Sequence, residues 1–209
     1  MKTQMYTPDH GYVKTNAVSI FLGGPINGAL EWRDKFMTHF QEKYSEFDER
    51  IAFLNPQRKE AFKKSTDINQ NEYQWQVVWE AYHLNSADII LFIIPEKEFE
   101  IENYARTTRF ELGEWMAKNN ILSTHPNIQD SDLNFPHILI CIDDSFAGKR
   151  YINNKVDSSQ LNSKIQSFES LSQLESRLFG IVQQISRQKH AGTLNIPNNN
   201  LSDFIGKSN

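Results

Sequence analysis

Two glutamates near the middle of the chain, Glu111 and Glu114, are spaced so that they could carry out acid–base or nucleophilic chemistry. They lie three residues apart in segment 107–118, whose apolar residues recur at helical spacing, so both fall on roughly one helix face. Two carboxylates on one face can divide the roles of nucleophile and proton donor. Glu114 also has a simpler interpretation, that of a solvated helix residue.

Glu111 has two competing interpretations. Thr108 followed three residues later by Glu111 forms the capping-box pattern, which predicts that a helix begins near Thr108. A capping glutamate needs no substrate. Alternatively, a carboxylate at a helix start lies near the positive end of the helix dipole and can stay ionised, as a nucleophile toward an anomeric carbon must be. The side chain can serve only one of these uses.

Two further carboxylates lie near the most apolar segment of the chain. Glu80 follows Trp79 in a segment with helical spacing, where it is either an acid in a pocket or an exposed neighbour of the aromatic residues. Asp88 begins the apolar run that follows. We include Asp88 among the candidate substrate-binding residues, although hydrogen bonding to a local turn already explains an aspartate there.

A glycine turn, Gly23-Gly24-Pro25, joins the apolar run 18–22 to a helical pattern that starts near residue 30. Its backbone N–H groups and the helix start could receive a phosphate or a sugar hydroxyl. The sequence around it matches neither the dinucleotide-binding fingerprint nor the P-loop, which removes support for dinucleotide binding and for NTP hydrolysis. The alternative is a tight turn that needs glycine for its backbone geometry.

Trp32 and Arg33 follow one turn into that helix and supply a stacking face and an anion partner, although an arginine on a helix is more often solvated. The histidines His39, His83 and His137 have no metal-ligand spacing and no cysteine partner. We therefore expect neither a metal nor another cofactor.

The elements that must position these residues alternate between strand and helix. The apolar runs predict strands at 18–22, 51–54, 87–94, 137–142 and 164–168, and helical spacing predicts helices near 30–40, 75–84, 108–118 and 171–187. This alternation predicts an α/β three-layer sandwich with an open, mostly parallel, flavodoxin-like sheet of about five strands. Such sheets bind ligands beyond the carboxyl ends of the strands, where the glycine turn and Glu111 fall.

Length and composition favour one domain, which we place at 18–189 between an extended lead-in, 1–17, and a loosely ordered tail, 190–209. The net charge of −4 gives no general attraction to polymeric nucleic acid or to a membrane surface. The single cysteine excludes a disulfide framework. No apolar run approaches the roughly 18 residues of a membrane span and the start is polar, so we expect a cytoplasmic protein.

Five short segments, taken in order, resemble the nucleoside 2-deoxyribosyltransferase-like family over about residues 18 to 142. They are 20–25, 32–33, 79–80, 87–92 and 110–115. The resemblance implies a flavodoxin-like enzyme that cleaves or transfers at the N-glycosidic bond of a (deoxy)nucleoside or nucleotide. It implies that Glu111 is the nucleophile that forms a glycosyl-enzyme intermediate, and that Glu80 is an acid that helps the base leave or holds the sugar.

The same resemblance implies that Gly23, Gly24, Pro25 and Arg33 line the sugar or phosphate side of the site. It also allows a homo-oligomer in which a neighbouring subunit completes the site. Transferase and hydrolase differ only in whether a second base or water resolves the intermediate, and both remain open. Two other hypotheses remain: a nucleotide-binding or sensing module without turnover, and a protein in which Glu111 only caps its helix.

Overall fold

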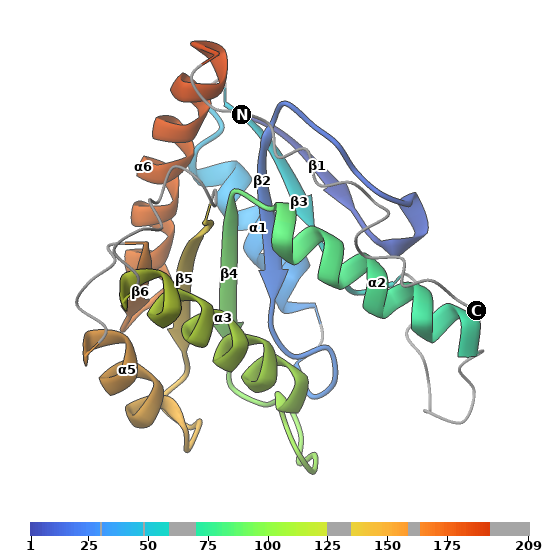
Figure 1. The fold of residues 1–209 in the computed structure, drawn as a ribbon, viewed down its shortest axis with the longest axis vertical. Helices are drawn as coiled ribbons and strands as arrows, with labels where there is room; N and C mark the ends of the chain where they lie inside the picture. The colour runs from blue at the N-terminus through green and yellow to red at the C-terminus, as the bar shows by residue number, and fades with distance from the viewer. Residues whose placement is uncertain (30, 48, 59–69, 125–134, 159–163, 193–209) are drawn as a thin grey trace.

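A computed structural model of the protein has one open, all-parallel sheet between two layers of helices (Figure 1). The structure describes residues 1–29, 31–47, 49–58, 70–124, 135–158 and 164–192. The sheet has six strands in the order β1-β3-β2-β4-β5-β6. The α/β sandwich expected from the alternating pattern is therefore confirmed.

The strands are β1 (Lys2–Tyr6), β2 (Val18–Gly23), β3 (Arg50–Leu54), β4 (Ile89–Ile94), β5 (His137–Ile142) and β6 (Ile165–Phe168). The helices within the described residues are the short 3-10 helix η1 (Pro8–His10), α1 (Trp32–Lys43), α2 (Gln70–Ser86), α3 (Arg106–Thr124), α5 (Lys149–Ser158) and α6 (Leu171–His190). Each of the five expected strands is present, as β2 to β6.

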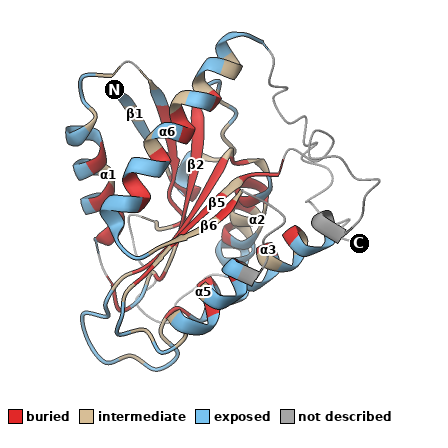
Figure 2. Ribbon diagram, turned by 90° about the vertical axis from the view of Figure 1, so that its left-hand side faces the viewer, coloured by how far each residue is buried: buried red, intermediate tan, exposed pale blue. Residues whose placement is uncertain are grey.

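The two faces of the sheet are covered by different helices. Helices α1 and α6 pack on one face, and α2, α3 and α5 pack on the other. Successive residues of β4 alternate between these two clusters, so all six of its side chains are buried, and Figure 2 shows the buried strands between exposed outer helix faces. A continuous aliphatic run is what a parallel strand covered on both faces requires.

The strand order sets the position of a ligand site. Without β1, the remaining strands follow the flavodoxin order, in which the chain reverses direction across the sheet between β2 and β4. The loops that leave β2 and β4 diverge at this point to opposite faces, one to α1 and the other to α3. Ligands of such sheets bind in the crevice that the diverging loops leave open.

One difference from the sequence analysis lies at the N-terminus. Segment 1–17 was expected to be an extended lead-in, and its residues Lys2–Tyr6 form the sixth strand, which pairs with β3 in parallel from Lys2↔Arg50 to Tyr6↔Leu54. The strand lies at the sheet edge and none of its side chains is fully buried. An edge strand of this kind needs no apolar run, so its sequence carries no strand pattern.

The helix predicted to begin near Thr108 is present and begins two residues earlier. Helix α3 begins at Arg106, because Asn103 and Ala105 adopt left-handed backbone angles (φ 59° and 56°) that end the preceding loop. Glu111 therefore lies in the second turn and forms no capping box with Thr108. Helix α5 was also not expected, since residues 143–150, which include its first two positions, have strong turn chemistry.

None of the helices in the described part of the chain combines the length and apolar character that crossing a bilayer requires. Residues 193–209 of the predicted tail lie outside the described residues.

Candidate active site

A cavity of about 440 Å³ opens at the carboxyl ends of β2, β3 and β4, beside the switch point of the sheet. It is lined by 23–27 at the end of β2 and in the turn after it, by 56–58 after β3, and by 101–105 of the loop after β4 together with 106–108 at the start of α3. Tyr73, Gln76, Val77 and Glu80 of α2 and Glu111 of α3 complete it. Three loops and two helices thus converge on one concave site of the size that small molecules occupy.

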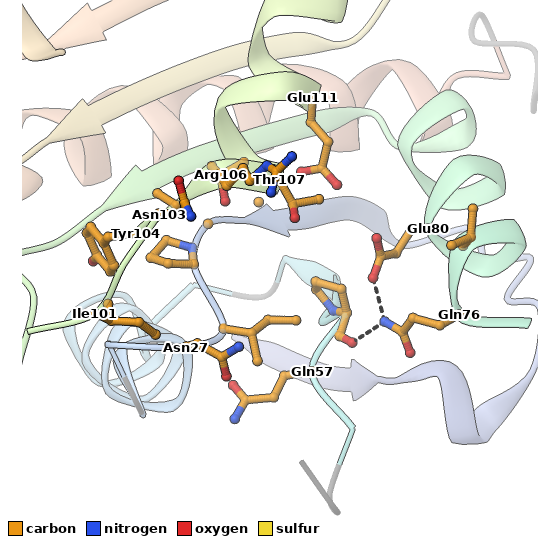
Figure 3. A pocket seen from close by; sticks show the side chains of 18 of the residues that line it. Asn27, Gln57, Gln76, Glu80, Ile101, Asn103, Tyr104, Arg106, Thr107 and Glu111 are labelled. Atoms are coloured by element: carbon orange, nitrogen blue, oxygen red, sulfur yellow. Dashed lines mark hydrogen bonds between the residues drawn. The ribbon is translucent and has the colours of Figure 1, made fainter. Parts of the chain in front are cut away.

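Glu80 and Glu111 enter this cavity from two different helices (Figure 3). The Glu80 carboxylate is held in position by Gln76, whose Nε2 donates to it and also donates 2.6 Å to the Pro56 carbonyl oxygen. Among the described residues, none donates a hydrogen bond to the Glu111 carboxylate. One carboxylate is thus fixed by its neighbours, and the other is left open to whatever fills the cavity.

The environment of the cavity raises the pKa of both carboxyl groups. Burial, followed by repulsion from Glu80, raises the pKa of Glu111 to about 8, and Arg33 opposes this rise. Burial also raises the pKa of Glu80, while the hydrogen bond from Gln76 and the charge of Arg33 lower it. The two carboxylates therefore favour sharing one proton over ionising together, which is the condition for one acid and one anionic group.

The glycine turn forms the floor of the cavity and is packed too tightly for side chains. A Cβ at Gly24 would collide with the Ile93 carbonyl oxygen and the Trp32 ring, and one at Gly23 would lie 2.8 Å from the Phe92 ring. Gly28 has a left-handed φ of 83°, and a Cβ there would lie 2.8 Å from the Ile101 side chain. Glycine is required here for close packing, and the same turn exposes its backbone to the cavity.

Trp32 and Arg33 lie behind this turn and do not line the cavity. The Trp32 Nε1–H donates 2.9 Å to the Pro25 carbonyl oxygen. The Arg33 guanidinium is 1% exposed and donates to three carbonyl oxygens, those of Leu22, Gly24 and Pro25. Arg33 was expected to line the sugar or phosphate side, and in the structure its hydrogen-bonding groups are turned toward the backbone of the turn.

Two other candidates lie away from the cavity. Asp88 precedes β4 at the amino end of the sheet, where its Oδ2 accepts from the backbone N–H and hydroxyl of Ser19 and from Lys189 Nζ, each at 2.7 Å. Glu114 lies on the exposed side of α3 in an ion pair with Lys118. The structure therefore brings together Gly23, Gly24, Pro25, Glu80 and Glu111, and it separates Asp88 and Glu114 from them.

Several residues that line the cavity were not singled out from the sequence. Gln76 lies four residues before Glu80, so helical spacing alone places it beside that carboxylate. Asn27 and Gln57 follow the carboxyl ends of β2 and β3, so the same rule about strand ends could have predicted them. Tyr104 comes from the loop after β4 and Arg106 from the first position of α3, and the sequence does not fix the path of the chain there.

An open parallel sheet with a pair of half-buried acids at its switch point defines a class of α/β proteins equipped for acid–base and nucleophilic chemistry on a small molecule. The family described as nucleoside 2-deoxyribosyltransferase like matches residues 17–126, which is more than half of the 209 residues. The chain belongs to this family. Its membership supports a nucleoside deoxyribosyltransferase-like activity on small-molecule nucleosides. No curated protein matches the chain.

Proposed function

We propose that the protein cleaves or transfers the N-glycosidic bond of a (deoxy)nucleoside or nucleotide, with Glu111 as the nucleophile and Glu80 as the proton donor. The observation that carries the proposal is the contrast between the two acids in one cavity. The Glu80 carboxyl is held by Gln76, as a positioned proton donor should be. The Glu111 carboxylate has an open approach to the cavity, as a nucleophile needs.

In the first step, an oxygen of ionised Glu111 bonds to the anomeric carbon of the sugar. The electron pair of the carbon–nitrogen bond leaves with the base, which takes the proton from Glu80. The result is a glycosyl ester on Glu111, a free base and an ionised Glu80. In the second step Glu80 takes a proton from water or from a second base, which attacks the anomeric carbon and releases Glu111.

The raised pKa values of the two acids bear on which of them carries the proton. A pair that holds one proton between two carboxylates supplies one acid and one anion from the same cavity. The reactive form carries the proton on Glu80 and the charge on Glu111, whereas in the empty cavity the raised pKa of Glu111, about 8, keeps the proton on Glu111 at neutral pH. The proposed mechanism therefore requires that substrate binding moves this proton to Glu80.

The direct test is incubation with deoxynucleosides and their monophosphates, with and without an acceptor base, followed by chromatography. Base released without an acceptor identifies a hydrolase, and exchange only with an acceptor identifies a transferase. Glu111→Gln should abolish both activities and the glycosyl-enzyme mass adduct, whereas Glu114→Gln, on the exposed side of the same helix, should retain them. Saturable nucleotide binding with no turnover and no adduct would instead indicate a binding module.

A further inference from the structure

Arg33 is a fully buried cation directly behind the cavity. Its guanidinium is 1% exposed, and the Trp32 ring lies against it with 4.4 Å between the guanidinium carbon and the ring centroid. An isolated charge is costly to bury, so buried arginines are normally paired with a carboxylate. Within the described residues, no carboxylate oxygen lies within ion-pair distance of Arg33.

The hydrogen bonds of Arg33 go to backbone oxygens of one turn. Nε donates 3.1 Å to Leu22, Nη2 donates 2.7 Å to Gly24, and Nη1 donates 3.1 Å to Pro25. These three carbonyls belong to the end of β2 and the turn that forms the cavity floor. The planar fork of the guanidinium thus fixes the position of the turn, and carbonyl dipoles satisfy its N–H groups without cancelling its charge.

The charge that remains acts on the two acids on the other side of the turn. Arg33 opposes the rise in the pKa of both Glu80 and Glu111 that burial causes. Burial lowers the pKa of Arg33 itself to about 9, and Glu80 and Glu111 are the first two groups that oppose this change. Arg33 therefore stays charged at neutral pH and favours the ionised form of the pair.

We propose that Arg33 is a positioning residue of the active site, which holds the turn 23–25 from behind and retains one negative charge on the Glu80–Glu111 pair. The proposal rests on the function proposed above. It reassigns Arg33 from a ligand for the substrate's sugar or phosphate to a buried counter-charge for the reacting acids. No contact between Arg33 and the substrate is needed.

Other charged groups around Glu111 have to be separated from this effect. They are Glu80 from α2, Glu114 on α3 itself, and Arg58, Glu102 and Arg106 around the rest of the cavity. Among these groups and Arg33, only Arg33 is fully buried and lowers the pKa of Glu111. The half-buried Arg58 and the exposed Arg106 are screened by solvent more than Arg33 and contribute less per charge.

The experiment is a carboxyl ¹³C NMR titration of protein labelled at glutamate, with Glu111→Gln and Glu80→Gln used to assign the two signals. Arg33→Met should raise the titration midpoint of Glu111 by about one pH unit or more, because an opposite charge is removed from a buried site. Arg33→Lys keeps the charge and should shift the midpoint less. Trp32→Phe removes a hydrogen bond to the same turn without changing any charge, so it should leave the midpoint in place.

The proposal would be overturned by an unchanged Glu111 midpoint in folded Arg33→Met protein, or by an equal shift in Trp32→Phe. Either result would mean that Arg33 only holds the turn in place. If Arg33→Met does not fold, the Arg33 Nε–H signal of the unmodified protein gives the same answer. That signal should move with the Glu111 titration and should lose this movement in Glu111→Gln. An Arg33 Nε–H signal that does not move during the Glu111 titration would also overturn the proposal.

Turnover provides a separate readout. The pH profile of kcat/KM should move to higher pH in Arg33→Met together with the NMR midpoint. If Arg33 only held the turn in place, its loss would instead lower kcat/KM at every pH. Because the titration needs no substrate, the two proposals can fail separately. A protein that cleaves no nucleoside but shows the Arg33-dependent midpoint refutes the proposed function alone, and the reverse result refutes the role of Arg33 alone.

Discussion

Glu80 is held by a hydrogen bond from Gln76, whereas Glu111, which faces the same cavity from another helix, has no such bond from any described residue. The two carboxyl groups have the same chemistry in the sequence and acquire different environments only in the fold. Helix α2 brings Glu80 over the ends of β2 and β3, and the loop after β4 carries Glu111 to the same place. This asymmetry is the basis on which we propose different roles for two identical side chains.

The pH dependence of turnover should be bell-shaped. The reactive pair carries one proton, so activity should fall below the first ionisation of the pair and again when the second proton leaves, near the raised pKa of about 8 at Glu111. The measurement is kcat/KM from pH 5 to pH 10. In Glu80→Gln the alkaline limb should disappear, because one carboxylate remains and no shared proton can be lost. An alkaline limb that survives this substitution contradicts the shared-proton assignment.

Glu80→Gln should also slow cleavage in a way that depends on the leaving group. A proton donor contributes roughly 10²–10⁴-fold to a rate, so loss of the acid should reduce cleavage of an ordinary nucleoside by that factor. A glycoside whose leaving group needs no proton should be cleaved nearly as fast as by the unmodified protein. Equal losses with both substrates would mean that Glu80 binds the sugar and does not donate the proton.

Burial of Glu111 has a cost in stability that depends on pH. The folded protein holds the Glu111 proton up to about pH 8, whereas the unfolded chain releases it near pH 4.5, so stability falls as the pH rises through this window. Glu111→Gln removes this loss. Its unfolding free energy relative to the unmodified protein should rise from pH 4.5 to pH 8 by up to about 4 kcal/mol.

Chemical denaturation at a series of pH values measures this difference. Glu114→Gln is the matched control, because Glu114 is exposed on the same helix and should give a difference that hardly changes with pH. A flat difference for Glu111→Gln as well would show that its carboxyl is not perturbed in the folded state.

Asp88 should matter for folding and not for the substrate. It forms a buried ion pair of 2.7 Å with Lys189, and these two side chains are 5% and 11% exposed. Asp88→Ala leaves Lys189 buried without its partner, which should cost about 3–5 kcal/mol of unfolding free energy. The KM of the protein that remains folded should not change. A raised KM with unchanged stability would return Asp88 to the substrate site.

The sequence predicted the elements that carry strong periodicity. The aliphatic run of β4 and the alternation around it were enough to predict an open parallel sheet, and the carboxyl-end rule then gathered Glu111 and the glycine turn at one edge. Asp88 could have been excluded by the same rule, because it precedes its strand. Asp88 was included among the candidates because it is close to β4 in sequence, although it lies at the end of the strand opposite to the cavity.

Other features could not be predicted from the sequence because tertiary contacts determine them. Strand β1 has no apolar pattern, since β3 supplies its hydrogen bonds and solvent covers its side chains. The start of α3 depends on the left-handed backbone at Asn103 and Ala105; asparagine tolerates this conformation, but alanine rarely adopts it, so the sequence did not predict the pair. Arg33 looked like a solvated or anion-binding arginine, and only the curvature of the chain after β2 turns it inward to three carbonyl oxygens.

The close packing under the cavity floor can be tested with two glycines. Gly24→Ala places a Cβ against the Ile93 carbonyl oxygen and the Trp32 ring, so the turn has to move, at a cost of about 1–3 kcal/mol. Gly113→Ala is the matched control. Gly113 is exposed within α3 with nothing within 4 Å of its added Cβ, and alanine there should stabilise the helix by up to about 1 kcal/mol.

Thermal unfolding gives the two stabilities, and nucleoside binding by calorimetry gives the effect on the site. Because Gly24 belongs to the floor and its carbonyl oxygen accepts from Arg33, moving the turn should weaken binding as well as stability. Gly113→Ala should change stability alone. Unaltered binding in folded Gly24→Ala protein would mean that the substrate does not rest on this turn, and would leave the other two loops and the two helices to bind it.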